Sequence, residues 1–296
     1  MSQPKPVVKS FDYSDEDNVI SKILFVIVLY KTPLINSTTF QTLKASLESN
    51  FINSRIDLLV CDNSPEEHID SKECVSSECF NLFHLYDSSN PGISISYNRA
   101  AEIASAKEKK WLLMFDQDTR LPIDGLHQYI KNLKNLPNFP LYVPKLFVAD
   151  KLMSPCRYFM YRGSHLPEIK AGINRLKRKN ILNNGVLVSL DAFKKVGGYD
   201  ERVWLYFSDF VFFDRLKKHY KEFVVLDCNV EHELSSSDYR DIRFAIERFC
   251  HYCQGAKAAS VSNSSFNAYL GYTLTVGLRR SCLNFLFSFD FPQEND

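Results

Sequence analysis

Apolar runs of strand length and segments with helical spacing alternate along the first half of the chain. The apolar runs occupy residues 23–30, 56–62, 82–86 and 111–116. Residues 37–47 and about 94–106 lie between them and place apolar side chains at helical spacing. Unbroken apolar runs are typical of strands that are buried on both faces, as in a parallel sheet. The pattern predicts an α/β fold with a mostly parallel sheet flanked by crossover helices.

The second half of the chain gives weaker signals. Residues 137–179 are rich in Pro, Tyr and basic side chains and read as an irregular insertion that faces a substrate. Beyond them we expect a strand or turn at 185–190 and a strand at 223–227. Helices are expected at 209–220 and 238–259.

Charge and composition exclude several classes of protein. The chain has 36 Lys and Arg residues and 35 Asp and Glu residues, which gives a net charge of +1. This charge lacks the basic excess that is typical of nucleic-acid-binding proteins. The eight cysteines are scattered through a chain too long to need a disulfide scaffold. The start lacks the apolar core of a secretory signal, and no run approaches the ~18 apolar residues of a membrane span. We therefore expect a cytoplasmic protein.

Two features near the C-terminus leave their roles open. The segment 266–291 is aromatic and aliphatic, with Arg279 and Arg280 in its middle. It could dock as a peripheral contact on the inner face of the cell membrane, cover the core or join two copies of the chain. Cys250 and Cys253 have the spacing of a zinc or redox site, but no second pair accompanies them, so we expect no metal there.

Polar side chains follow three of the predicted strands directly. Tyr30 follows the first strand, and Asp62 with Asn63 ends the second. Asp116 ends the strand at 111–116, and Gln117 and Asp118 follow it. Ligands of open parallel sheets bind beyond the carboxyl ends of the strands. Carboxylates this close repel each other unless a cation joins them, which predicts a divalent ion bridging a diphosphate, although an ordinary acidic turn is the alternative.

Four blocks in this order resemble the inverting GT-A glycosyltransferases of the GT2 group, and within it the rhamnosyltransferase-like branch of bacterial polysaccharide assembly. They are VIVLYK with LLVCDNS, then NPGISISYNRA, then LLMFDQDT, and then NNGVLVSLDAFKKVGGYDERVWLYFSDFVFFDRL, and they span residues 23–216. The resemblance implies a Rossmann-like GT-A sheet and a nucleotide-sugar donor, with dTDP-rhamnose as the best guess and hexose and galactofuranose donors as open alternatives. It also implies a divalent metal, Mg²⁺ or Mn²⁺, and a lipid-linked saccharide as the acceptor.

The resemblance also assigns roles to matching residues. Donor binding is implied for Tyr30, Asp62, Asn63, Asn90, Gly92, Asn98, Asp116 and Gln117. Asp118 matches the metal ligand. His232 is similar in position to a histidine that many GT-A enzymes place beside the metal or diphosphate, where it could be a third ligand, and an ordinary surface histidine is its alternative. The acceptor side comprises Asn184, Gly185, Asp200, Glu201 and Trp204. Asp209 matches the catalytic base, and its alternative is an acid that stabilises the first turn or N-cap of a helix.

The same residues give a domain division and two rival functions. We expect a polar arm over 1–20, a GT-A domain over 21–236 and a helical, membrane-proximal extension over 237–296; the donor half of the domain is 21–120 and the acceptor half is 121–236.

A phosphohydrolase of the haloacid-dehalogenase type could use Asp116 and Asp118, but Arg120 stands where its motif has Thr or Val. A catalytically silent sugar-nucleotide-binding protein is the other rival, because Ser208 and Val211 replace acids that are common in the GT2 group.

Overall fold

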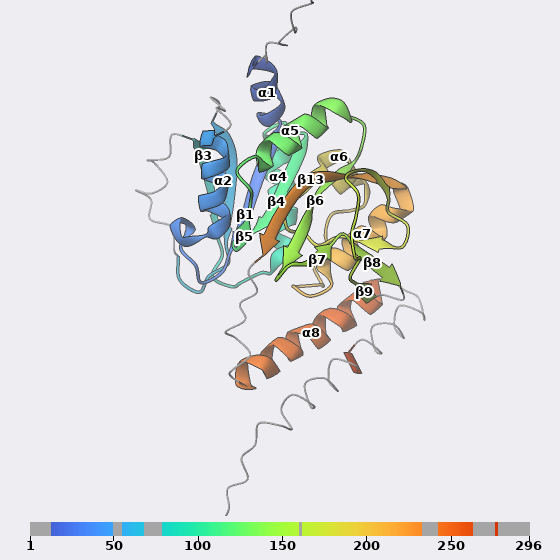
Figure 1. The fold of residues 1–296 in the computed structure, drawn as a ribbon. Coiled ribbons are helices and arrows are strands. Elements are labelled where there is room, and N and C mark those ends of the chain that lie inside the picture. Colours follow the sequence, from blue (N-terminus) through green and yellow to red (C-terminus); the bar gives the residue numbers. More distant parts are fainter. Residues whose placement is uncertain are drawn as a thin grey trace, which may run out of the picture.

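A sheet of ten strands, with helices on both faces, organises the described part of the chain (Figure 1). The structure is a computed structural model that describes residues 13–49, 55–67, 79–159, 162–232, 242–262 and 276–277. The strands are β1 (Ile23–Leu29), β2 (Ile56–Asp62), β3 (Phe80–Tyr86), β4 (Trp111–Asp116), β5 (Thr119–Arg120), β6 (Leu141–Val148), β7 (Lys151–Ser154), β10 (Gly172–Arg175), β12 (Val186–Ser189) and β13 (Glu222–His232). Their order is β10-β13-β6-β12-β4-β1-β2-β3, with β5 beside β13 and β7 beside β6.

The helices cover the sheet in two groups. They are α1 (Tyr13–Ile20), the 3-10 turn η1 (Leu34–Asn36), α2 (Thr38–Ser49), α4 (Ile93–Ala106), α5 (Gly125–Asn135), α6 (Leu190–Lys195), α7 (Ser208–His219) and α8 (Ile242–Ser262). Buried side chains of α1, α2 and α5 pack on one face of the sheet, and those of α4, α6 and α7 pack on the other. A separate small sheet has the order β11-β8-β9, from β8 (Cys156–Phe159), β9 (Arg162–Ser164) and β11 (Lys179–Asn180).

Strand β1 shows why the central strands read as unbroken apolar runs. Phe25 and Ile27 point into the core with α2 and α5, whereas Leu24 and Val26 point into the core with α4, α6 and α7. All four side chains are fully buried, and each contributes about 1.5–3 kcal/mol through the apolar surface it removes from water. The prediction of a strand buried on both faces is confirmed.

The register of the parallel strands brings the predicted polar residues to one edge. β1 pairs in parallel with β2 on one side and with β4 on the other, and Val28 lies beside both Cys61 and Asp116. β2 pairs in parallel with β3. Residues that follow β1, β2 and β4 therefore leave the sheet side by side, as the sequence predicts.

The expectation of an irregular insertion over 137–179 is wrong. This stretch forms β6, β7 and β10 of the main sheet together with the whole small sheet. The sequence pattern does not predict β6 because the strand contains Pro144, and proline rarely occurs inside a sheet. The register between β6 and β13 shifts between Val225 and Asn229, and Pro144 lies at this irregularity, where a residue without an N–H is tolerated. The strand or turn expected at 185–190 is β12, which runs antiparallel to β4.

Helix α8 packs against the segment that leads into α7. Phe207 and Val211 form a small core with Ala256 and Ala259 of α8. Gly255 lies so close to this segment that a Cβ there would be 2.4 Å from the Tyr206 carbonyl oxygen. The helix expected at 238–259 is thus present as α8, packed on the core, while most of the segment 266–291 lies outside the described residues. No described helix is long and apolar enough to cross a membrane.

We expect Gly255→Ala to destabilise the protein, although replacing glycine by alanine inside a helix normally stabilises it. The added methyl group would push α8 away from the Tyr206 backbone and cost about 1–3 kcal/mol of unfolding free energy. Chemical denaturation measures the change. Val261→Ala on the exposed side of α8 is the control and should change the unfolding free energy by less than about 0.5 kcal/mol. A Gly255→Ala protein more stable than wild type would contradict the packing described.

Candidate active site

Hydrogen bonds join the loops that follow β1 and β2, where the sequence predicts that the nucleotide binds. The Asp62 side chain is buried, and its Oδ1 accepts a hydrogen bond from the backbone N–H of Ser64 at 3.0 Å. The Ser64 hydroxyl oxygen accepts one from the backbone N–H of Lys31 at 2.7 Å. Tyr30 is 43% exposed, with the Lys31 ammonium 5.1 Å from its ring centre. Asp62 therefore shapes this loop, and the Tyr30 ring offers an open aromatic face beside it.

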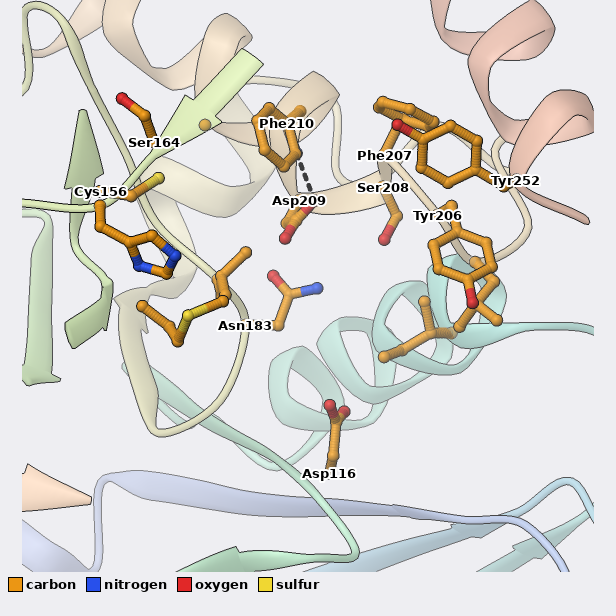
Figure 2. Close-up of a pocket in the computed structure, with 16 residues that line it drawn as sticks. Asp116, Cys156, Ser164, Asn183, Tyr206, Phe207, Ser208, Asp209, Phe210 and Tyr252 are labelled. Carbon is orange, nitrogen blue, oxygen red and sulfur yellow. Dashed lines mark hydrogen bonds between the residues drawn. The ribbon is translucent and has the colours of Figure 1, made fainter. Parts of the chain in front are cut away.

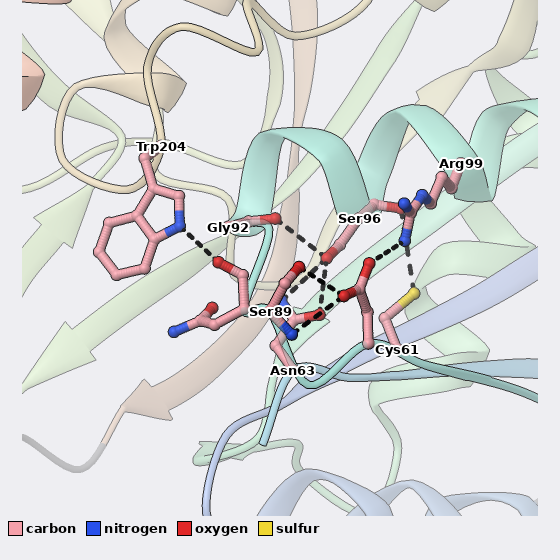
Figure 3. A network of polar contacts seen from close by, with 9 residues as sticks. Cys61, Asn63, Ser89, Gly92, Ser96, Arg99 and Trp204 are labelled. Atoms are coloured by element: carbon pink, nitrogen blue, oxygen red, sulfur yellow. Dashed lines mark hydrogen bonds and ion pairs between the residues drawn. The ribbon is translucent and has the colours of Figure 1, made fainter. Parts of the chain in front are cut away.

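A junction of polar contacts joins three of the predicted blocks (Figure 3). The Asn63 amide donates a hydrogen bond to the Ser96 hydroxyl at 3.0 Å, and this hydroxyl donates to the Gly92 carbonyl at 3.1 Å. The Trp204 indole N–H donates to the Asn90 carbonyl at 2.9 Å. A Cβ on Gly92 would lie 2.2 Å from the Trp204 side chain, and the φ of Gly92 is +89°. Gly92 is therefore needed for this close approach.

Asn98, expected among the donor-binding residues, is engaged elsewhere. Its amide nitrogen donates to the Tyr199 carbonyl at 3.0 Å and to Glu201 at 2.9 Å, and its amide oxygen accepts from the Tyr199 N–H at 2.8 Å. Asp200 accepts hydrogen bonds from Arg202 at 2.7 and 2.9 Å. The Asn98 contacts anchor α4 to the segment before α7, whereas the contacts between Asp200 and Arg202 lie within that segment.

The segment Asp116-Gln117-Asp118 is fixed through its backbone and its middle side chain. The Gln117 side-chain oxygen accepts a hydrogen bond from the Tyr30 N–H at 2.7 Å. The Asp116 N–H donates to the Asn184 side-chain oxygen at 3.0 Å, and the Tyr97 hydroxyl donates to the Asp116 carboxylate at 3.4 Å. Burial, and then the charge of Asp118, raise the pKa of Asp116 to about 6.

Strand β13 brings His232 to Asp118. In the pairing of β5 with β13, His232 lies beside Thr119, the residue after Asp118. Nδ1 of His232 is 3.1 Å from Oδ1 of Asp118 and 3.4 Å from the Asn184 amide nitrogen. Oδ1 of Asp118 is shielded from solvent and accepts no hydrogen bond from the described residues. The two residues that the sequence predicts as metal ligands are therefore neighbours.

These two residues fit a divalent cation. Nδ1 of His232 faces both the Asp118 carboxylate and the Asn184 amide, and an imidazole nitrogen beside a carboxylate oxygen is a donor pair that a divalent cation can use. No group of three or more His, Cys, Asp or Glu side chains within the described residues is arranged to hold a metal. Substrate oxygens or water would complete the coordination, as is usual for Mg²⁺.

Asp209 lies in the first turn of α7, which begins after Phe207 in a left-handed conformation with φ of 71°. Oδ1 of Asp209 accepts a hydrogen bond from the Phe210 N–H at 2.7 Å. Burial raises the pKa of Asp209 to about 7, and the negative charge of Asp116 adds to the rise. A carboxylate with a pKa near neutrality is suited to proton transfer. Phe207 holds the N-cap position, and Asp209 is the acid of the first turn of α7, as one form of the alternative reading expects.

One pocket of about 480 Å³ connects Asp116 with Asp209 (Figure 2). This is the size of a small-molecule site. Asn183 lies between the two carboxylates, and aromatic rings of Tyr206, Phe210 and Tyr252 line the pocket. Asp118 is not among the lining residues, but its charge acts on Asp116 at the end of the pocket. The predicted base Asp209 and the predicted donor-binding residue Asp116 thus line one cavity, and the predicted metal ligand Asp118 lies outside its lining.

Several residues of the pocket could not be found by pattern reasoning. Asn183 stands next to the predicted Asn184, and only the duplicated asparagine could have drawn attention to it. His165 enters from the small sheet, with Nδ1 3.1 Å from the Leu152 carbonyl oxygen. Tyr252 enters from α8, where it reads as one of many apolar positions.

Gly185, predicted on the acceptor side, has φ of +74° and a Cβ there would meet Pro144 at 2.8 Å, so its role is to let the chain turn.

The strand order, the mixed sheet and the helices on both faces define the GT-A fold, a Rossmann-like fold. The chain is similar in structure to S. aureus TarS, whose residues 1–349 superpose with a TM-score of 0.55 at 12% identity over 86% of this chain and 72% of that one. The complex of that TarS fragment with UDP-GlcNAc gives 0.56 at 12% identity, over 80% of this chain and 66% of that one. The complex with UDP gives 0.54 at 14%, over 80% and 64%. No protein-family model and no curated protein sequence matches the chain.

The raised pKa of Asp209 predicts the pH dependence of stability. The folded protein keeps a proton on Asp209 up to about pH 7, whereas the unfolded chain releases it near the ordinary value of 3.8. The folded state therefore binds more protons in this window, and stability falls as pH rises through it. Asp209→Asn removes the loss, so its Tm relative to wild type should increase from pH 4 to pH 8.

Asp227→Asn is the matched control for this experiment. Asp227 is exposed, and the Lys145 ammonium at 2.9 Å holds its pKa below the ordinary value. Removing this carboxylate loses stability only above the lowered pKa, so the Tm difference should not increase towards pH 8. An Asp209→Asn difference that stays flat or falls with pH would contradict the protonation state described for Asp209.

Proposed function

We propose that the chain is an inverting glycosyltransferase that moves a sugar from a nucleotide donor to a hydroxyl group of a saccharide acceptor. One observation supports it most: a single pocket has Asp209, with a pKa of about 7, at one side and Asp116 at the other. Asp118 and His232, with Oδ1 and Nδ1 3.1 Å apart, lie close enough to Asp116 for their charges to act on it. Such a pocket provides a base for the attacking hydroxyl and an anchor for the departing diphosphate.

In this proposal Asp209 takes the proton of the acceptor hydroxyl as its oxygen attacks the sugar. The other groups bind and orient. Tyr30 and Asp62 hold the nucleotide end, and the aromatic rings at the mouth of the pocket pack against the faces of sugar rings. Mg²⁺ or Mn²⁺ held by Asp118 and His232 supplies positive charge that stabilises the departing diphosphate.

The donor we propose first is dTDP-rhamnose, because Asp116-Gln117-Asp118 resembles the rhamnosyltransferase branch. The TarS complexes with UDP and UDP-GlcNAc support a nucleotide-sugar site on this fold, so UDP-GlcNAc is the donor to test beside it. For the acceptor we propose a lipid-linked saccharide of surface polysaccharide assembly, met at the cytoplasmic face of the membrane.

Asp209→Asn should lower kcat by about 10²–10⁴-fold while donor binding changes little, because only the proton acceptor is lost. In the wild-type protein kcat should rise with pH through about 7, as the Asp209 carboxyl loses its proton. Metal-dependent hydrolysis of dTDP-rhamnose or UDP-GlcNAc measures turnover without a known acceptor. The control is Asp191→Asn, which removes an exposed acid from the first turn of α6 and should leave turnover unchanged.

The same assay separates the rival functions. Release of inorganic phosphate from phosphomonoesters, with no effect of nucleotide sugars, would favour a phosphohydrolase. Binding of nucleotide sugars without turnover in any metal would favour a silent binding protein. Either result would contradict the transferase.

His232→Ala should weaken Mn²⁺ binding by about 10-fold or more, because one of two protein ligands is lost. Electron paramagnetic resonance of free Mn²⁺ in the presence of UDP measures the affinity directly. His219→Ala at the exposed end of α7 removes a histidine far from Asp118 in the sequence and serves as the control. Equal Mn²⁺ affinity in the His232→Ala and wild-type proteins would show that the metal binds elsewhere.

A further inference from the structure

Asn183 is a buried polar residue in the middle of the pocket to which neither the sequence patterns nor the proposed chemistry gives a role. Its side chain is 7% exposed, and it lies between Asp116 and Asp209 (Figure 2). The Tyr199 hydroxyl donates a hydrogen bond to Oδ1 of Asn183 at 2.5 Å. Since the oxygen end of the amide is held in this way, the nitrogen end faces the pocket.

The tyrosine that holds Asn183 is itself fixed by packing. The Tyr199 ring is buried and stacks on Phe212 of α7 with the ring centres 4.3 Å apart and the planes 2° from parallel. The Tyr97 ring of α4 also packs against it, with the ring centres 5.3 Å apart. Burial raises the pKa of Tyr199 well above its usual value, so the hydroxyl keeps its proton and donates it. The orientation of the Asn183 amide is therefore set by rigid elements.

Nδ2 of Asn183 carries two hydrogens, and within the described residues no protein group accepts them. A donor left open in a mostly buried position costs free energy unless a ligand or water completes it. The carboxyl groups of Asp116 and Asp209 line the pocket on either side of Asn183, and carboxylates accept hydrogen bonds and repel anions. A neutral, oxygen-rich ligand such as a sugar ring suits this combination, whereas a second phosphate does not.

We propose that Asn183 is a sugar-recognition residue, whose amide nitrogen donates a hydrogen bond to a hydroxyl or acyl oxygen of the sugar carried by the nucleotide donor. Tyr199 is the positioning residue that orients it. The inference rests on the proposed transferase function and adds to it: the enzyme reads the sugar directly, between the base and the diphosphate end, and not only through the nucleotide.

The test compares the affinity for a nucleotide sugar with that for the bare nucleotide. Calorimetry with Mg²⁺ uses two pairs of probes, UDP-GlcNAc with UDP and dTDP-rhamnose with dTDP. For the pair that binds wild type, Asn183→Ala should weaken the nucleotide sugar by about 3- to 10-fold and leave the nucleoside diphosphate unchanged, because one hydrogen bond to the sugar is lost.

A second variant covers the risk that Asn183→Ala leaves the buried Tyr199 hydroxyl without an acceptor and unfolds. In the double variant Asn183→Ala, Tyr199→Phe both members of the pair are removed, which is far less disruptive than removing one. It should show the same selective loss of sugar affinity. Tyr199→Phe alone keeps the amide but releases its orientation, and should weaken the nucleotide sugar by a smaller factor. Asn135→Ala, at the exposed end of α5, is the matched control and should change neither affinity.

Three results would overturn the inference. If the double variant binds nucleotide sugar and bare nucleotide as wild type does, Asn183 does not contact the sugar. If both affinities fall by the same factor, Asn183 supports the pocket as a whole. If the wild-type protein binds no nucleoside diphosphate, the proposed function itself fails and the sugar subsite fails with it, so the two failures are distinguished.

Discussion

Burial of two carboxyl groups in one pocket, to which their mutual repulsion adds, is the constraint on which the site depends. Burial and the charges of neighbouring acids raise the pKa of Asp116 to about 6 and that of Asp209 to about 7. Tyr97 and Asn184 hold Asp116 in place without supplying positive charge. A site built in this way favours positive charge, whether a bound cation or the charge that develops on a sugar as its bond to diphosphate breaks.

The sheet topology creates this concentration of charge. Parallel pairing of β1 with β2 and β4 brings Asp62 and Asp116 to the same edge. The long strand β13 then returns from the far side of the sheet and pairs with β5, which places His232 beside the turn that carries Asp118. Helix α7 carries Asp209, which lines the same pocket as Asp116. Asp118 and His232, more than 90 positions apart in the sequence, thus lie together because β5 pairs with β13.

The first half of the fold could be predicted because its strands are buried on both faces and are separated by plain helical spacing. The residues at the strand ends, Asp62, Asp116 and Asp118, followed from that pattern alone. Strand β6 escaped because Pro144 interrupts it at a bulge that only the paired strand β13 reveals. Asn183 escaped for a different reason: its orientation depends on Tyr199, whose ring packs on Phe212 of α7. Long-range packing of this kind leaves no periodic trace in the sequence.

The most direct test of the account is diffraction from crystals grown with Mn²⁺ and a nucleoside diphosphate, UDP and dTDP in separate crystals, recorded at the manganese absorption edge. The account predicts one anomalous peak bonded to Asp118 and His232, with the diphosphate on the same ion and the base beside Tyr30 and Asp62. A manganese peak away from these two residues, or a nucleotide bound outside the pocket edge that Asp116 forms, would contradict it.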